Sequence, residues 1–151
     1  NNSYPPTPIP SYPKMHLTTI LCPLDFSTTS TGLVEYAAAL ATATGAALRL
    51  LHVVEPAPPS DEERPATCAG RLAALQTKAN EAGATQVSTG LLRGEAATEI
   101  VAEAARCRAD VIVIGAQGQT GLTRFLMGST AEAVLRTASC ATLLVRNSVK
   151  S

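Results

Sequence analysis

A glycine-rich segment in the C-terminal half of the chain is the clearest candidate for chemistry. Two residues separate Gly115 from Gly118, and nine more separate Gly118 from Gly128 and Ser129. The segment begins where an apolar run ends and stops where a helical pattern begins. Glycines let backbone amides approach a phosphate closely, and a helix N-terminus adds N–H groups and a partial positive charge of about half a unit. The spacing therefore predicts a phosphate-binding loop, in which the Gly128 amide meets a phosphate.

The same residues also have a purely structural interpretation. Gly115, Gly118 and Gly121 can simply turn the chain between a strand and a helix, and Ser129 with Glu132 has the spacing of a capping box. Glycine-rich loops of this kind also occur without ligands. Spacing alone does not choose between the two interpretations, and both can hold together.

Asp25 is a second candidate, because it follows the first apolar run, where a strand is expected to end. A carboxylate at a strand end can accept a hydrogen bond from an adenine amino group or a ribose hydroxyl. The alternative is that Asp25 caps the helix that follows. Arg124, within the glycine-rich segment, is either a solvated charge or a partner for a phosphate.

The two histidines and four cysteines do not suggest a metal site. His16 adjoins the N-terminal tail and His52 lies inside an apolar run, and neither has a second ligand at a suitable spacing. The cysteines form no CxxC pair, which argues against a zinc site and a secreted disulfide framework. We expect reduced thiols, three of them in core-like surroundings. Cys68 lies in a polar stretch and is either an exposed reactive thiol or a structural residue.

Apolar runs alternate with helical patterns along the chain, and this order decides where the candidate residues lie. Strands are predicted at 18–24, 46–54, 85–92, 110–114 and 141–145, and helices after the Ser/Thr cluster at 27–31 and at 66–81, 95–106 and 129–137. The alternation predicts an α/β fold, a doubly wound open sheet of five parallel strands with helices on both faces. We expect the strand order 3-2-1-4-5. Ligands bind such sheets at the carboxyl ends of the strands, where the strand order reverses. The loops that hold Asp25 and Gly115 should therefore flank the site.

Composition limits the class of protein. Twelve basic residues balance twelve acidic ones, so no overall positive field is available for nucleic acid or an anionic membrane. No apolar run approaches the roughly 20 residues that cross a bilayer, and no signal pattern opens the chain, which predicts a soluble, cytoplasmic protein. Residues 1–14 hold five prolines and no apolar periodicity. We therefore predict a proline-rich tail, 1–14, followed by one domain, 15–151.

The motifs resemble those of the universal stress protein family. Its nucleotide-binding members carry Gly-x2-Gly-x9-Gly-(Ser/Thr) at this place, and Gly115, Gly118, Gly128 and Ser129 match that pattern without a gap. The resemblance covers about 17–146. It includes Cys-Pro-Leu-Asp-Phe-Ser from residue 22, Leu-His-Val-Val from residue 51 and Arg-Gly-Glu from residue 93.

The resemblance implies an adenine-nucleotide site. It places Asp25 and Val53 against adenine or ribose, beside a wall shaped by Pro23 and Leu24. It places the contacts around ribose and phosphates at Gly115, Gln117, Gly118, Gly128, Ser129 and Thr130. ATP, ADP or AMP is the implied ligand, with Mg²⁺ held mainly by the phosphates, and no catalytic residue is implied. Gln117 stands where many relatives carry a charged or histidine side chain, which weakens the expected hold on a terminal phosphate.

More than one function remains open at this point. The first is a dimeric regulatory module whose nucleotide occupancy is sensed by an unknown protein partner. The second is a slow ATPase or autophosphorylating enzyme, although the sequence has no Walker lysine. The third is a dimeric interaction module without nucleotide, which the intact glycine pattern disfavours. Relatives of this family pair through the last strand, so we expect a homodimer through residues 141–146.

Overall fold

The structure, a computed structural model, describes residues 3–8, 16–56, 64–116 and 128–146. Its boundaries differ from the predicted ones by at most two residues, as where the third strand begins at Val87 rather than Thr85. The elements in chain order are β1 (Thr19–Pro23), α1 (Ser30–Thr44), β2 (Ala47–Val54), α2 (Pro65–Glu81), β3 (Val87–Arg93), α3 (Ala96–Arg106), β4 (Val111–Gly115), α4 (Ser129–Thr137) and β5 (Ala141–Val145).

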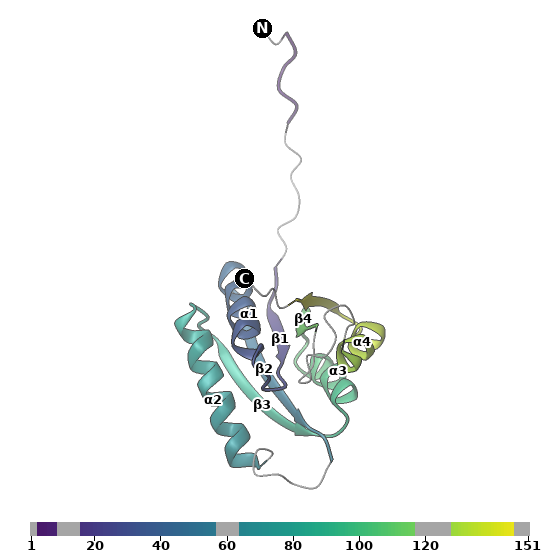
Figure 1. The fold of residues 1–151 in the computed structure, drawn as a ribbon. Helices are drawn as coiled ribbons and strands as arrows, with labels where there is room; N and C mark the ends of the chain where they lie inside the picture. Colours follow the sequence, from purple (N-terminus) through teal and green to yellow (C-terminus); the bar gives the residue numbers. More distant parts are fainter. Residues whose placement is uncertain (1–2, 9–15, 57–63, 117–127, 147–151) are drawn as a thin grey trace.

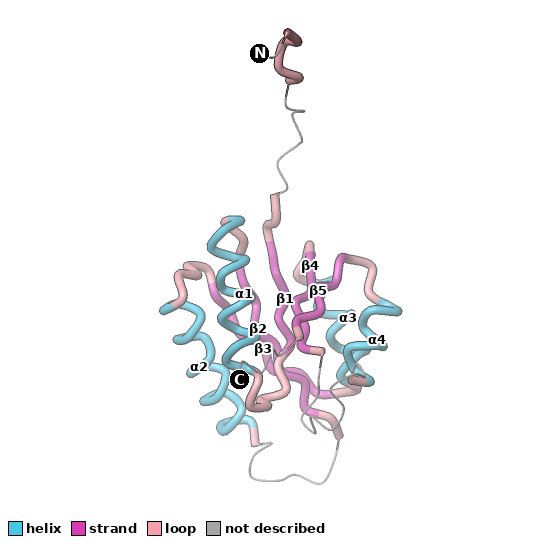
Figure 2. Tube along the Cα trace, turned by 45° about the horizontal axis from the view of Figure 1, so that its top comes forward, coloured by secondary structure: helices cyan, strands magenta, loops and turns pink. Residues whose placement is uncertain are grey.

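The five strands are all parallel and lie in the order β3-β2-β1-β4-β5, which confirms the predicted sheet. Helices α1 and α2 cover one face, and α3 and α4 cover the other (Figures 1 and 2). β1 and β4 pair at the centre, with Ile20 opposite Val111. The strand order reverses between these two strands, so the topology points to the carboxyl ends of β1 and β4 as the place for a ligand.

Two apolar layers hold the helices on the sheet. Alternate residues of each strand point to opposite faces, so Ile20 and Leu48 pack toward α1 and α2, while Leu21 and Ile112 pack toward α3 and α4. All four side chains have no exposed surface. Because the central strands are buried on both faces, their sequences are almost continuously apolar.

The burial of three cysteines differs from what the sequence pattern suggested. Cys68 is fully buried, so the alternative that made it an exposed reactive thiol is wrong. It shares the buried face of α2 with Leu72, Leu75 and Ala79, whereas its polar neighbours in sequence lie on the outer face. Cys107 and Cys140 are only half-buried, which is less than the core-like surroundings expected for them.

Local residue chemistry fixes the ends of the elements away from the site. Gly45 ends α1 with a positive φ of 75°, as expected of a glycine that follows a helix. At the amino ends of β1 and β4, the Asp110 carboxylate accepts hydrogen bonds from the Thr18 amide (2.7 Å), the Thr18 hydroxyl (2.8 Å) and the Thr19 amide (3.0 Å). These bonds lower the pKa of Asp110, and the bond from the Thr19 amide has the largest effect. The two central strands are therefore joined at the edge opposite the site.

Candidate functional site

The carboxyl ends of β1 and β4 bring the two predicted loops to one edge of the sheet. β1 pairs with β4 along the centre of the sheet. Pro23 ends β1 opposite Leu51 of β2, and Gly115 ends β4 opposite Val145 of β5. The Asp25 turn and the glycine-rich segment therefore leave neighbouring strands in the same direction, as the sequence predicted.

Asp25 shapes a tight turn directly after β1. Its carboxylate accepts a 2.9 Å hydrogen bond from the amide of Ser27, two residues further on. Between them Phe26 has a positive φ of 59°, a conformation that is uncommon for an aromatic residue. The residue that precedes α1 is Thr29, so Asp25 does not cap the helix itself. A carboxylate has about four acceptor positions, so the bond to Ser27 is compatible with a further hydrogen bond to a ligand.

His52 supports this turn from β2. Its Nδ1 lies 2.7 Å from the carbonyl oxygen of Leu24, and since a carbonyl only accepts, Nδ1 is the donor. Its ring lies on that of Phe26 with centroids 4.1 Å apart, and the Arg71 guanidinium lies 5.3 Å from the same Phe26 ring. His52 is 5% exposed, which places its side chain in the core. Its contact with the Asp25 turn was missed, although its place next to Val53 was a signal for it.

The residues expected to contact adenine, Pro23, Leu24 and Val53, lie near the carboxyl ends of the adjacent strands β1 and β2. Leu24 is buried, and its amide donates a 2.7 Å hydrogen bond to the Leu51 carbonyl, which extends the sheet just beyond Pro23. Val53 lies near the carboxyl end of β2 and packs on the α3 and α4 side of the sheet. The structure thus places Pro23, Leu24 and Asp25 beside the strand that carries Val53.

A backbone hydrogen bond joins the two ends of the glycine-rich segment. The Gly128 amide donates to the Ala116 carbonyl at 2.7 Å, and the Ala116 amide donates to the Val145 carbonyl at 2.9 Å. The Gly128 amide therefore has a partner within the protein, which differs from the expectation that it meets a phosphate. The predicted site residues Gln117, Gly118 and Arg124 lie outside the described residues.

The start of α4 carries the predicted site residues Ser129 and Thr130. Gly128 precedes the helix, so Ser129 is already its first residue, and no side chain among the described residues caps it. The predicted capping box is absent for this reason, and the Glu132 carboxylate instead pairs with Arg136 at 3.2 Å. The first amides of a helix have no partner inside it, and its N-terminus carries partial positive charge. The amides of Ser129 and Thr130 therefore suit a phosphate.

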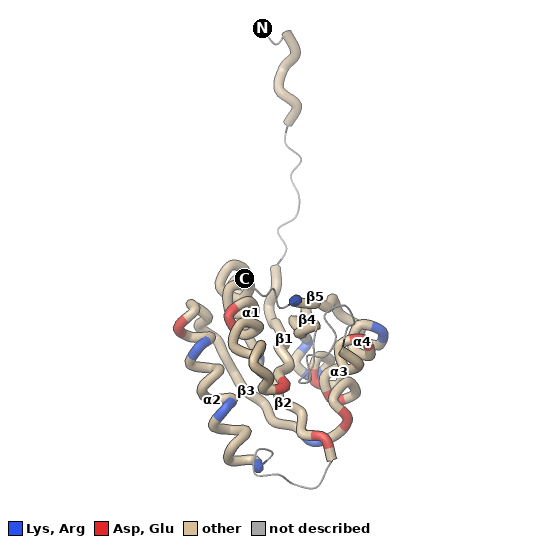
Figure 3. Tube along the Cα trace, in the orientation of Figure 1, with Lys and Arg blue, Asp and Glu red and all other residues tan. Residues whose placement is uncertain are grey.

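The described residues contain no candidate metal centre. None of their His, Cys, Asp and Glu side chains gather in groups of three or more that could hold a metal ion. No helix in this part of the chain is long and apolar enough to cross a membrane. Acidic and basic residues both occur on α2, α3 and α4 (Figure 3). The described residues thus form no broad field of one sign that would attract an anion to this edge.

Comparison with known proteins identifies the family. A profile of the universal stress protein family matches residues 16–146. Universal stress protein MJ0531 of Methanocaldococcus jannaschii is 45% identical over 65 residues, which are 43% of this chain and 38% of that relative. The match therefore spans well under half of the relative's length.

Solved structures agree over most of the chain. A universal stress protein in complex with cAMP has a TM-score of 0.74 at 25% identity, covering 89% of this chain and 100% of that one. Universal stress protein UspA from Lactobacillus plantarum has a TM-score of 0.75 at 26% identity, covering 88% and 100%. A universal stress protein from Archaeoglobus fulgidus in complex with dAMP shares the fold, with a TM-score of 0.69 at 24% identity, covering 86% and 98%. With the family profile matched across nearly all of its fold, this chain belongs to the universal stress protein family.

Proposed function

We propose that this protein is a regulatory stress-response module that binds an adenine nucleotide, ATP foremost, at the carboxyl ends of β1 and β4. The observation that carries the proposal is the first turn of α4, which no described side chain caps and which the bond between Gly128 and Ala116 joins to the same sheet edge as Asp25. A positively polarised helix start next to a carboxylate matches a ligand with phosphates at one end and hydrogen-bond donors at the other. The related protein solved with cAMP binds an adenine nucleotide on a similar fold.

The two halves of the nucleotide would meet different parts of the site. Adenosine would lie against Pro23, Leu24 and Val53, with Asp25 accepting a hydrogen bond from adenine or ribose. The phosphates would lie at the amides of Ser129 and Thr130, with the remaining contacts from Gly115, Gln117, Gly118 and Arg124. Mg²⁺, when present, would be held mainly by the phosphates, because the described residues near the site include no cluster of metal ligands.

A nucleotide at α4 would be coupled to the edge of the sheet. Ala116 bonds to Gly128 on one side and to Val145 on the other, so a ligand that orders the start of α4 also acts on the position of β5. We infer that residues 141–146 pair with the same strand of a second copy, and that a regulatory protein partner reads the resulting change. Ala141 is exposed, and the other four side chains of β5 are half-buried, as pairing at this edge requires.

The proposed module acts in the cytoplasm without nucleic acid or membrane as a partner. We further propose the division into a tail, 1–14, and a domain that begins at 15. The site offers groups that bind and orient, and the sequence has no Walker lysine to assist phosphoryl transfer. We therefore favour a binding function over ATP hydrolysis or autophosphorylation.

Mass spectrometry of the small molecules that denaturation releases from the purified protein tests this function. We expect ATP, ADP or AMP in near-stoichiometric amount from the wild-type chain and little from Gly128→Val. A wild-type protein that releases no adenine nucleotide, and takes up none when incubated with ATP, would contradict the proposal.

A further inference from the structure

The sheet has two edge strands, β3 and β5. An edge strand presents backbone N–H and C=O groups that can pair with a strand of another molecule. Proteins prevent unwanted pairing by covering these groups. The two edges of this sheet differ in how far side chains cover these groups. The difference affects which edge a second copy of the chain can pair with.

The outward backbone groups of β3 follow from its pairing with β2. The Gln86 carbonyl accepts a 2.8 Å hydrogen bond from the Leu48 amide, and the Gly94 amide donates a 3.0 Å bond to the Val54 carbonyl. Backbone groups of alternate residues in a parallel strand point to opposite sides. The even-numbered residues of β3 therefore bond to β2. The groups that point outward belong to Val87, Thr89, Leu91 and Arg93.

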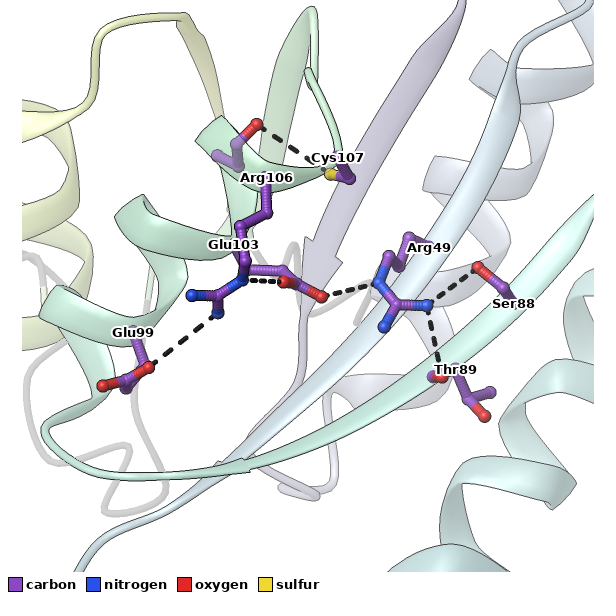
Figure 4. A network of polar contacts seen from close by, with 8 residues as sticks. Arg49, Ser88, Thr89, Glu99, Glu103, Arg106 and Cys107 are labelled. Carbon is purple, nitrogen blue, oxygen red and sulfur yellow. Dashed lines mark hydrogen bonds and ion pairs between the residues drawn. The ribbon is translucent and has the colours of Figure 1, made fainter.

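Two side chains cover carbonyls on this outer side. Gln76 of α2 donates from Nε2 to the Val87 carbonyl at 2.8 Å. Arg49 of β2 reaches across the opposite face of the sheet and donates from Nη1 to the Thr89 carbonyl at 3.2 Å and to the Ser88 hydroxyl at 3.1 Å (Figure 4). Two carbonyls of this edge are thus covered, one from each face of the sheet.

The Arg49 side chain is held in this position by its surroundings. Its Nε donates to Glu103 of α3 at 2.7 Å, and the second oxygen of Glu103 accepts from Arg106 at 2.8 Å. Burial raises the pKa of Glu103, but the hydrogen bonds from Arg49 and Arg106 outweigh it and hold this pKa below its usual value. At Gly90 a β-carbon would lie 2.6 Å from Arg49 Nη2, so a glycine makes room for the guanidinium.

The other edge has no such cover among the described residues. The Val145 carbonyl accepts from the Ala116 amide, so the odd-numbered residues of β5 bond to β4. The backbone N–H and C=O groups of Thr142 and Leu144 therefore point outward. No described side chain makes a hydrogen bond to the backbone of this strand.

We propose that Arg49 and Gln76 close β3 to strand addition, so that a second copy of this chain pairs at β5 alone. This inference rests on the proposed dimer and adds to it the residues that select its edge. An unblocked β3 would pair with another edge while β5 remained engaged, and dimers would then join into larger assemblies.

Sedimentation velocity of the variant Arg49→Lys/Gln76→Ala tests the proposal. Lysine keeps a cation beside Glu103 but lacks the planar fork that reaches Thr89, and alanine removes the second donor. We expect species larger than the wild-type assembly that increase with protein concentration. The matched control is Arg106→Lys/Thr77→Ala, which changes the other partner of Glu103 and the neighbour of Gln76 but no donor to β3. The control should keep the wild-type size.

Hydrogen exchange separates pairing at β3 from other association. The amides of Thr89 and Leu91 point away from β2 and should become slower to exchange only when β3 gains a neighbour. A variant with wild-type mass would overturn the inference, as would a larger variant in which these two amides exchange as fast as in the wild type. A monomeric wild-type chain would refute the β5 dimer instead, and the variant's own mass and exchange would still decide the role of β3.

Discussion

The Gly128 amide and the Ala116 carbonyl are 2.7 Å apart, and this hydrogen bond joins the end of β4 to the start of α4. Ala116 is itself bonded to β5 through the Val145 carbonyl. The start of α4 is therefore hydrogen-bonded to the sheet through Ala116. Preorganisation of a binding site lowers the ordering cost of binding.

Asp25→Ala should weaken ATP and AMP binding alike, by roughly 1 to 3 kcal/mol, because it removes a hydrogen bond to the part that both ligands share. Asp25→Asn is the matched control, since an amide oxygen can still accept from the Ser27 amide and keep the turn. Titration calorimetry of both nucleotides measures the effect. Equal affinities for Asp25→Ala and wild type would exclude Asp25 from the adenosine contacts.

Val145→Asp should shift the protein toward monomer in analytical ultracentrifugation. Val145 is half-buried on the edge strand β5, and a pair of carboxylates at a shared edge would repel each other. Leu135→Asp is the control, because Leu135 is an exposed apolar residue of α4 outside that edge. An unchanged Val145→Asp dimer would rule out this interface.

Asp110→Ala should lower the free energy of unfolding at pH 7 by about 1 kcal/mol, the usual net value of a hydrogen bond, since the group is partly exposed. The folded-state pKa of Asp110 is lowered, so its stabilising effect is present above the unfolded pKa of about 3.9 and is lost as pH falls through the folded value. Urea unfolding at several pH values should show the difference between wild type and variant shrinking on acidification. A difference that stays constant down to the lowest pH would contradict the carboxylate's role.

Native alkylation with iodoacetamide should leave Cys22 and Cys68 unlabelled. Both side chains have no exposed surface, and burial raises the pKa of the Cys22 thiol to about 12. The half-buried Cys107 and Cys140 should label first, yet more slowly than a free thiol, because burial raises the pKa of each. Peptide mass spectrometry reads out each position, with denatured protein as the reference. Rapid native labelling of Cys68 would show that the α2 face is open.

The sequence predicted what depends on periodicity. Apolar runs broken by helical patterns suffice to predict five parallel strands joined through helices, because parallel neighbours need such crossovers. Periodicity does not predict contacts between residues that are distant in the sequence. The residues around Gly128 do not indicate that its amide donates to the Ala116 carbonyl. The polar neighbours of Cys68 made the apolar face of α2 hard to recognise in the sequence. The support of the Asp25 turn by His52 likewise depends on which strands become neighbours.

Calorimetric titration of ATP into wild-type protein and Gly128→Val tests the nucleotide site most directly. Gly128 has φ −60° and ψ 150°, an extended conformation that valine also adopts, so the fold should survive at a cost of about 1 kcal/mol. The valine side chain of the variant would crowd the amides of Ser129 and Thr130, where the phosphates are proposed to lie. We predict measurable ATP binding by wild type, none by Gly128→Val, and native far-ultraviolet circular dichroism for both. Wild-type ATP affinity in a folded Gly128→Val variant would contradict the phosphate site at the start of α4.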